Sequence, residues 1–358
     1  MQIRYGSVNE QMRDALARVA PGTPLRDGIE RVVRAQAGAL LVLDDGPDVL
    51  SICSGGFLVD APYSPQRLSE LAKMDGAIII SLDGGRIARA NVHLVPDPTV
   101  PTSETGTRHR TAERVARSLG VPVVSASEEM GVINVYAGGG KRQLQEIGRL
   151  LERANQALQT LERYKTRLDD AIANLTAVEV EDVATLRDVA AVVQRGEMVH
   201  RIADEIETMI VELGVDARLL RLQLDELYGE IDDELELVVA DYVADDRTAT
   251  ETLTEMSHLT DDEIHDLRLA ARALHRSADP DDLGQSVASR GLRLLHRTNR
   301  LTPESATAIA DHFDGLAKLQ RATIADLSEV DGIDSNTAAE VRETLTRVTE
   351  TAILDQYN

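Results

Sequence analysis

Two short groups of polar residues in the first third of the chain have the side chains that phosphate chemistry needs. The first is Asp75-Gly76-Ala77, which comes just before an apolar run ending at Ile80. An acid at a strand edge can hold a metal ion or polarise a hydroxyl, and the glycine lets a ligand approach the backbone. The second, Gly106 to Thr111, brings hydroxyls and two guanidinium groups to a helix predicted to begin near residue 112. Amides and arginines at a helix N-terminus suit phosphate oxygens.

Both groups also have an ordinary structural interpretation. Asp-Gly pairs are frequent in turns, and a basic triplet before a helix commonly lies on the surface with no ligand. Residues 137–141 hold three glycines and a lysine but lack P-loop spacing, so we predict a glycine-rich turn there. The histidines show neither HExxH spacing nor cysteine partners, and Cys53 lies in an apolar run typical of a core thiol.

These groups need a scaffold, and residues 1–140 predict an α/β domain, a mixed sheet flanked by helices. Short β-branched runs bounded by Gly, Pro or Asp predict strands at residues 39–43, 49–53, 77–82, 87–94, 121–125 and 132–136. Helical spacing lies between them at residues 28–37, 64–74 and 111–119.

The rest of the chain predicts helices. Apolar residues at three- and four-residue spacing predict long helices at 144–168, 183–213 and 218–243 within an all-α domain of residues 141–285. Thr260 to Glu263 forms a capping box that predicts another helix start. A linker is predicted at 278–282, and a compact module follows at 290–358, with short helices at 303–312, 315–320, 323–328 and 336–348.

Composition restricts the functional classes. The 358-residue chain has a formal net charge of −23, which argues against a general polyanion binder. Local nucleic-acid contacts stay open, because affinity depends on where cations cluster. No run approaches the ~18 apolar residues of a membrane span, and no apolar stretch follows a basic start, so we expect no membrane segment or signal peptide. A single cysteine fits a reducing compartment, and we expect a cytoplasmic protein.

Several blocks, taken together, resemble the diadenylate cyclase (DAC) domain family. They are Gly55-Gly56-Phe57, residues 66–80 and Thr107-Arg108-His109-Arg110-Thr111, in one order and spacing, with further agreement at residues 91–96 and 125–129. Residues 164–169, 212–214 and 222–227 resemble the helical spine of family members that scan DNA. The C-terminal module resembles their helix-hairpin-helix domain, so the resemblance covers nearly the whole chain.

The resemblance implies a reaction in which two ATP molecules form cyclic di-AMP and two pyrophosphates. Two DAC domains meet face to face, and each ATP 3′-hydroxyl attacks the α-phosphate of the other ATP. It also implies a homo-octamer, a Mg²⁺ or Mn²⁺ cofactor, association with the nucleoid through DNA, and regulation by branched or damaged DNA. The alternative function is a non-catalytic, nucleotide-sensing, DNA-binding scaffold. The presence of both Asp75 and the Arg108-His109-Arg110 triplet favours catalysis. An ATP hydrolase is disfavoured because Walker motifs are missing.

The resemblance assigns roles by position. Asp75 orients or deprotonates the 3′-hydroxyl, with a metal ion, while Gly76 lets the nucleotide approach and the main chain of Leu94 reads adenine. Residues 107–111 form the triphosphate cradle, in which Arg108, His109 and Arg110 act in catalysis and Thr107 and Thr111 in binding. Ser127 is a further phosphate contact, and either Glu128 or Glu129 a metal ligand. A helix N-cap at Ser127 followed by acidic first-turn residues is the competing interpretation.

DNA contacts are expected in the C-terminal module. Helix-hairpin-helix domains hold DNA phosphates through the backbone of a Gly-x-Gly turn, which here reads Gly332-Ile333-Asp334. A carboxylate in place of the second glycine repels a phosphate and restricts the backbone. Arg293, Arg297 and Arg300 share a predicted helix face and form the best remaining basic patch.

Overall fold

The structure is a computed structural model that describes residues 10–128, 131–243, 247–274, 283–299 and 301–356. These residues form two compact units, each considered by itself. One contains the described residues up to Leu158 together with residues 204–224, and the other contains residues 159–203 and those from Asp225 onward. The predicted linker at 278–282 lies outside the described residues.

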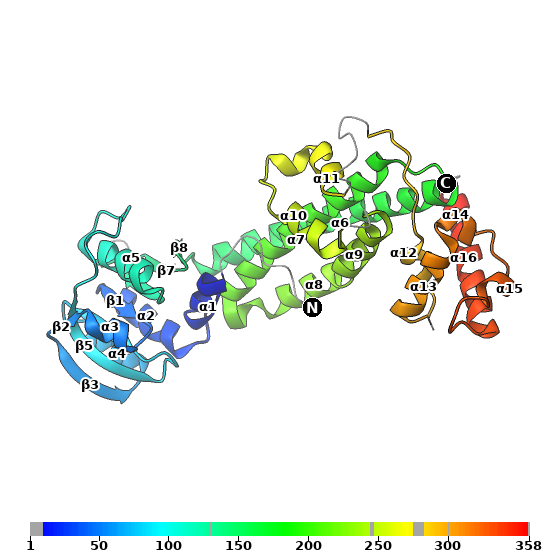
Figure 1. The fold of residues 1–358 in the computed structure, drawn as a ribbon. Coiled ribbons are helices and arrows are strands. Elements are labelled where there is room, and N and C mark those ends of the chain that lie inside the picture. The colour runs from blue at the N-terminus through cyan, green and yellow to red at the C-terminus, as the bar shows by residue number, and fades with distance from the viewer. Residues whose placement is uncertain (1–9, 129–130, 244–246, 275–282, 300, 357–358) are drawn as a thin grey trace. The chain divides into compact units, whose positions relative to one another are not determined.

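An eight-stranded mixed sheet forms the centre of the first unit (Figure 1). Its strand order is β2-β5-β4-β1-β6-β7-β8, and β3 pairs with β5. Only β1 and β4 run parallel among the described strand pairs. The strands are β1 (Ala39–Val42), β2 (Cys53–Ser54), β3 (Phe57–Pro62), β4 (Ala77–Ile80), β5 (Arg86–Leu94), β6 (Val123–Ala126), β7 (Ile133–Ala137) and β8 (Gly140–Gln143).

Helices cover both faces of this sheet. On one face, α1 (Glu10–Arg18), α2 (Pro24–Arg34) and α4 (Pro65–Leu71) pack against alternate strand residues such as Leu41 and Ile78. On the other face, α3 (Pro47–Ser51) and α5 (Thr107–Leu119) pack against Leu40 and Ile79. Strands buried on both faces must be apolar throughout, which explains the uninterrupted runs in β1 and β4. The predicted α/β domain is confirmed.

One predicted strand is wrong. Residues 49–53 begin as helix α3, and only Cys53 and Ser54 form a strand. Pro47 occupies the first helical turn, where its fixed φ favours a helix, and Asp44 Oδ1 accepts a 2.5 Å hydrogen bond from the Gly46 N–H. Strands β3 and β8 were not predicted, because both expose most of their residues and carry no clear apolar alternation.

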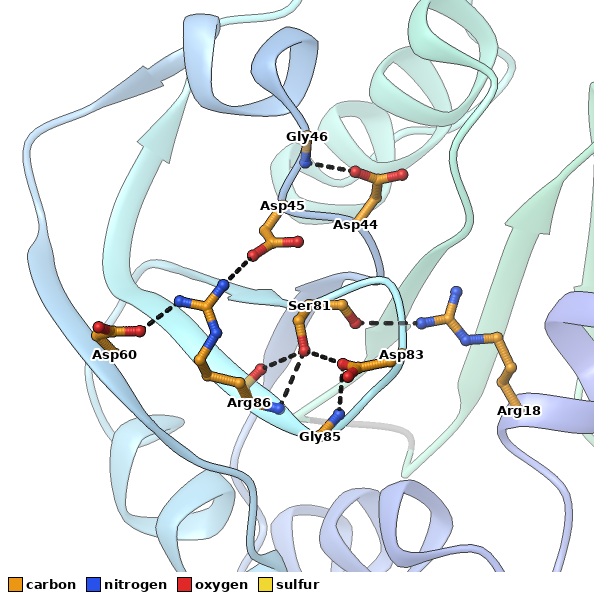
Figure 2. A network of polar contacts seen from close by, with 9 residues as sticks. All are labelled: Arg18, Asp44, Asp45, Gly46, Asp60, Ser81, Asp83, Gly85 and Arg86. Carbon is orange, nitrogen blue, oxygen red and sulfur yellow. Dashed lines mark hydrogen bonds and ion pairs between the residues drawn. The ribbon is translucent and has the colours of Figure 1, made fainter.

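Polar contacts close the sheet edge where β1 and β4 end (Figure 2). Arg86 bridges Asp45 and Asp60 with its guanidinium group. In the turn between β4 and β5, Asp83 Oδ1 accepts hydrogen bonds from the Ser81 hydroxyl and the Gly85 N–H at 2.5 and 2.9 Å. These polar groups are hydrogen-bonded or ion-paired to one another, so the network holds the loop after β1 and the turn between β4 and β5 in place. Asp75, which precedes β4, lies at the opposite edge of the sheet.

Long helices follow the sheet, as predicted. The helical elements are α6 (Ile147–Val180), α7 (Leu186–Leu213), η1 (Gly214–Ala217), α8 (Arg218–Tyr228), α9 (Ile231–Tyr242), α10 (Ala249–Ser257), η2 (Glu263–His265), α11 (Leu267–Leu274), α12 (Leu292–Leu295), α13 (Pro303–Phe313), α14 (Leu316–Leu319), α15 (Ile324–Leu327) and α16 (Ser335–Gln356). No described helix combines the length and apolar character that crossing a membrane requires.

Two details of the helical prediction are wrong. The single helix predicted at 218–243 is interrupted at Gly229 and Glu230, because glycine lowers helix propensity. The capping box forms its hydrogen bonds between Thr260 and Glu263, but it opens only the 3₁₀ turn η2.

A buried polar cluster joins α6, α9 and α12 inside the second unit. Arg293 and Glu179 form an ion pair whose side chains are 2% and 0% exposed. Glu179 also accepts a 2.6 Å hydrogen bond from the Tyr242 hydroxyl. Asp241 accepts hydrogen bonds from the backbone N–H groups of Leu292 and Arg293 at 2.6 and 3.1 Å, which caps α12. We call these four residues, Glu179, Asp241, Tyr242 and Arg293, the buried hub.

Candidate functional site

A pocket of about 770 Å³ opens in the first unit at the sheet edge opposite the network of Figure 2. Its size lies in the ~300–1,000 Å³ range of small-molecule sites. Its walls come from the start of β1 and β4, the end of β5, the first turn of α5 and the segment after β6. The lining residues are Leu40, Asp75, Gly76, Ala77, Asn91, Val92, His93, Leu94, Gly106, Thr107, Arg108, His109, Thr111, Ser127 and Glu128.

The pocket unites the two groups that the sequence separated by about 30 residues. Arg108 Nη2 lies 3.5 Å from Asp75 Oδ1, and the Asp75 side chain is fully exposed. Gly38 makes room for Arg108, because a Cβ at this position would collide with the guanidinium group. No motif or spacing in the sequence indicates this role for Gly38. An acid and a guanidinium group therefore meet at one pocket wall.

Helix α5 begins at Thr107, so residues 107–111 form its first turn and do not precede it as expected. The N-cap, Gly106, provides no side-chain hydrogen bond to this turn. Backbone N–H groups and the positive end of the helix dipole therefore adjoin the pocket. Arg110 is exposed and does not line the pocket, because it projects from a different side of the helix than Arg108.

Gly76 has a structural reason to be glycine. A Cβ at Gly76 would lie 2.6 Å from the backbone of Asn91, whose φ is +54°. The pairing of β4 with β5 shifts register beside this contact. Close packing of two strands therefore requires the glycine, independently of any ligand.

His109 lies between two arginines in the sequence, but it does not act as a third cation. Its Nδ1 lies 2.8 Å from Ser125 Oγ and 3.1 Å from the Tyr136 hydroxyl. Burial lowers the pKa of His109 below its ordinary value, and Lys141 and Arg108 lower it further, while Glu104 opposes them. His109 is therefore neutral at neutral pH and adds no charge to the pocket.

The segment leading into α5 is fixed by Glu113. The Glu113 carboxylate accepts hydrogen bonds from the Thr102 hydroxyl and the Ser103 N–H at 2.5 and 2.9 Å, and pairs with Arg117 at 2.9 Å. Burial alone would raise the pKa of Glu113, but these hydrogen bonds and Arg117 lower it below its ordinary value. The ionised Glu113 carboxylate therefore holds in place the segment that leads into α5 and so into this wall of the pocket.

The remaining predicted residues divide into two groups. Leu94, Ser127 and Glu128 line the pocket, whereas Glu129 lies outside the described residues. Ser127 belongs to a turn between β6 and β7, where its carbonyl accepts a hydrogen bond from Gly131, and no described helix begins there. Sequence reasoning missed Leu40, Asn91, Val92 and His93 as wall residues. The Asn91-to-Pro96 block of the resemblance was the available signal for the last three of them.

The donor set suits a divalent cation shared with phosphates. The described residues contain no group of three His, Cys, Asp or Glu side chains that could hold a metal on its own. The carboxylates on the pocket wall are those of Asp75 and Glu128. Mg²⁺ typically binds one or two carboxylates and completes its shell with substrate phosphates and water. The residues present fit a cation of this kind.

The proposed DNA-binding residues are less accessible than expected. Arg293 is buried in the hub, so its prediction as a DNA contact is wrong. Arg297 pairs with Glu234 at 3.6 Å, and Arg300 lies outside the described residues. The helix α12 ends at Leu295, so Arg293 and Arg297 do not lie on one face of that helix.

The predicted hairpin turn is exposed at Gly332, while the Ile333 side chain is buried in the core of the C-terminal helices. The Ile333 N–H donates a 3.1 Å hydrogen bond to the Val330 carbonyl. Asp334 Oδ1 accepts a 2.7 Å hydrogen bond from the Thr337 N–H, which is the bond of an N-cap. The N-terminus of α16 therefore already holds a carboxylate.

Comparisons with known proteins define the class. Residues 26–141 match the DAC model, described as DisA bacterial checkpoint controller nucleotide-binding. Residues 144–282 match the model of the DisA bacterial checkpoint controller linker region. The α/β unit with its pocket therefore contains a DAC nucleotide-binding domain, and the predicted enzyme class, diadenylate cyclase, is confirmed at the level of this domain family.

Relatives that match this chain over nearly their whole length support the same family assignment. The DNA integrity scanning protein DisA of Streptomyces coelicolor is 50% identical over 97% of this chain and 94% of its own length. DisA of Kineococcus radiotolerans is 49% identical over 98% of both chains. The chain belongs to the DisA family. A crystal structure of DacA from Staphylococcus aureus also matches, with 26% identity over 38% of this chain and 89% of that chain, at a TM-score of 0.28.

Proposed function

We propose that this chain condenses two ATP molecules into cyclic di-AMP and two pyrophosphates, with the residue roles given below. The observation that carries the proposal is the meeting of Asp75, Arg108 and the first turn of α5 around one pocket. An acid for a hydroxyl and donors for a triphosphate are the two requirements of this transfer. The DAC family match supports the same reaction.

Each side chain has a separate task. The exposed Asp75 carboxylate accepts the 3′-hydroxyl proton or orients that hydroxyl. Arg108, Thr107 and the N–H groups at the start of α5 bind phosphate oxygens and offset the charge that develops on the leaving pyrophosphate. Mg²⁺ or Mn²⁺, held by Asp75 with Glu128 or Glu129, supplies further charge neutralisation when bound. The main chain of Leu94 contacts adenine, and Ser127 and Thr111 add phosphate contacts.

Two copies must face each other, because a ribose hydroxyl has to lie in line with the α-phosphate of the other nucleotide. We therefore propose that the DAC domains pair face to face within a homo-octamer. The full exposure of Asp75 supports this, since its carboxylate is available to a nucleotide bound by the partner. Arg110, exposed on α5 outside the pocket, is also available to such a partner.

We propose further that the C-terminal helices from residue 290 form a helix-hairpin-helix domain that binds branched DNA in the cytoplasm, at the nucleoid, and regulates synthesis. Proteins named for DNA integrity scanning are this chain's relatives, which supports a DNA partner. The Asp334 cap and the burial of Arg293 favour weak, salt-sensitive binding.

The test is a product assay with ATP and Mg²⁺ or Mn²⁺. We expect cyclic di-AMP. ADP would indicate a hydrolase, and unchanged ATP a nucleotide sensor, and either result contradicts the proposal. Asp75→Asn should lower synthesis by about 10²-fold or more while ATP binding changes little.

Asp60→Asn is the matched control for that variant. Asp60 lies at the opposite edge of the sheet, and its φ of +46° is tolerated by asparagine (Figure 2). This variant should keep near-normal turnover. Near-normal turnover in Asp75→Asn would remove the proposed role of that carboxylate.

A further inference from the structure

Side chains behind the pocket wall hold the ring of His109. Its Nδ1 contacts Ser125 and Tyr136 on β6 and β7, which are both buried. His109 lines the pocket, whereas Ser125 and Tyr136 are not among the lining residues. Nδ1 is therefore directed into the domain, and Nε2 belongs to the part of the ring that borders the pocket.

The protons of this cluster can be placed by following it away from the pocket. Lys141 Nζ lies 2.6 Å from Glu104 Oε1, and that same oxygen accepts a 3.1 Å hydrogen bond from the Tyr136 hydroxyl. An ionised carboxylate beside an ammonium group only accepts hydrogen bonds. Burial raises the pKa of Tyr136, so the phenol stays protonated. Its single proton points at Glu104, because a charged acceptor outcompetes a neutral one.

The phenol oxygen is then left as an acceptor, and the state of His109 follows. An unprotonated Nδ1 would place its lone pair 3.1 Å from that oxygen with no proton between them. A protonated Nδ1 donates toward Ser125 Oγ and the Tyr136 oxygen, while the Ser125 hydroxyl donates to Tyr136. If the Ser125 hydroxyl instead donated to an unprotonated Nδ1, two lone pairs would face each other in the 3.1 Å contact with Tyr136, so only the second arrangement places a proton in both short contacts of Nδ1.

We propose that Glu104, Tyr136 and Ser125 are positioning residues that hold His109 in its Nδ1-protonated form, so that Nε2 accepts a hydrogen bond from a ribose hydroxyl of the bound nucleotide. Phosphate oxygens are acceptors and are not recognised by an unprotonated Nε2, whereas ribose hydroxyls donate. The inference rests on the proposed nucleotide substrate and separates His109 from the phosphate-binding Arg108. It names the ribose as the group that this wall residue reads.

The test uses ligand binding by the full-length protein, which does not depend on turnover. Affinities are compared for ATP, 2′-deoxy-ATP, 3′-deoxy-ATP and ADP. One deoxy analogue should bind the wild type about three- to tenfold more weakly than ATP, the value of one net hydrogen bond. His109→Ala should abolish this difference and leave the ratio of ATP to ADP affinity unchanged.

Two further variants test the relay itself. In Glu104→Gln the amide can donate to the Tyr136 oxygen, so the phenol proton turns to His109 and the imidazole changes tautomer. The deoxy difference should disappear in this variant, although His109 is still present. Tyr136→Phe removes the hydroxyl but keeps the aromatic ring of this residue, and it should weaken the deoxy difference. Glu70→Gln, an exposed partner of Lys73 on α4, is the matched control and should keep the full difference.

The pH response gives an independent readout. Glu104, Lys141, Arg108 and Tyr136 are the charged or titratable groups that act on His109. Protonation of Nε2 turns it from an acceptor into a donor. The difference in affinity between ATP and the deoxy analogue should therefore be present at pH 7 and should disappear at pH values well below 6.5, the ordinary pKa of histidine. Arg108→Ala should not remove this difference.

The inference is wrong if neither deoxy analogue is discriminated, or if His109→Ala changes only the ratio of ATP to ADP affinity. The latter result would make His109 a phosphate donor. Absence of cyclic di-AMP in the product assay would overturn the proposed reaction but leave this binding test valid.

Discussion

Arg293→Met should destabilise the second unit by stranding a buried carboxylate. Glu179 is fully buried, and Arg293 is the cation paired with it, at 2% exposure. Removing one partner of such a pair costs about 3–5 kcal/mol, because the other charge is left in a poorly solvated interior. Methionine fills similar space, so the loss reflects charge more than volume. For a unit of this size the cost corresponds to a fall in Tm of roughly 6–20 °C.

Differential scanning calorimetry at pH 8 measures this fall. The double variant Arg293→Met with Glu179→Leu removes both charges and should recover most of the loss, since a buried pair exchanged for apolar residues is often neutral.

The control is the exposed pair of Arg153 and Glu205 in the first unit, with side chains 47% and 51% exposed. Arg153→Met should cost no more than about 1 kcal/mol. A Tm within one degree of the wild type for Arg293→Met, or a double variant less stable than the single one, would refute the reasoning.

Three further predictions concern other positions. Gly38→Ala should push Arg108 from the pocket wall and weaken ATP binding about tenfold without changing Tm, as calorimetric titration can show; unchanged affinity would contradict the role of Gly38. Asp334→Asn keeps the N-cap but removes its charge, so affinity for branched DNA at low salt should rise about fivefold by fluorescence anisotropy and the gain should shrink at high salt; equal affinities would place the phosphate contact elsewhere. Burial, and then Glu179, raise the pKa of Asp241 to about 7 against the opposing hydrogen bonds of α12. The folded state therefore binds this proton more tightly than the unfolded state, so this group's contribution to stability falls as pH rises from about 4 to about 7. In urea unfolding, Asp241→Asn should lose less stability than the wild type over that pH range. An identical dependence of the unfolding free energy on pH in both proteins would exclude Asp241 as the source of the loss.

Sequence by itself determined the central strands and the family. Residues in β1 and β4 are apolar on both faces, which only a covered sheet tolerates, and the ordered blocks around Asp75 and Thr107 identified the DAC domain. The apolar pattern failed at two places. Helix α3 replaced a strand after Pro47, and exposed β3 carried no apolar alternation.

Only the tertiary structure decided which polar residues act together. Gly38, Ser125, Tyr136 and Glu104 bear on Arg108 and His109 from separate elements, and no spacing along the chain relates them. The same holds for Arg293, which the sequence placed on a surface and which packing buries against Glu179, 114 residues away. Hydrogen bonding and burial depend on distances in space, so the chemical state of these groups follows from the folded arrangement.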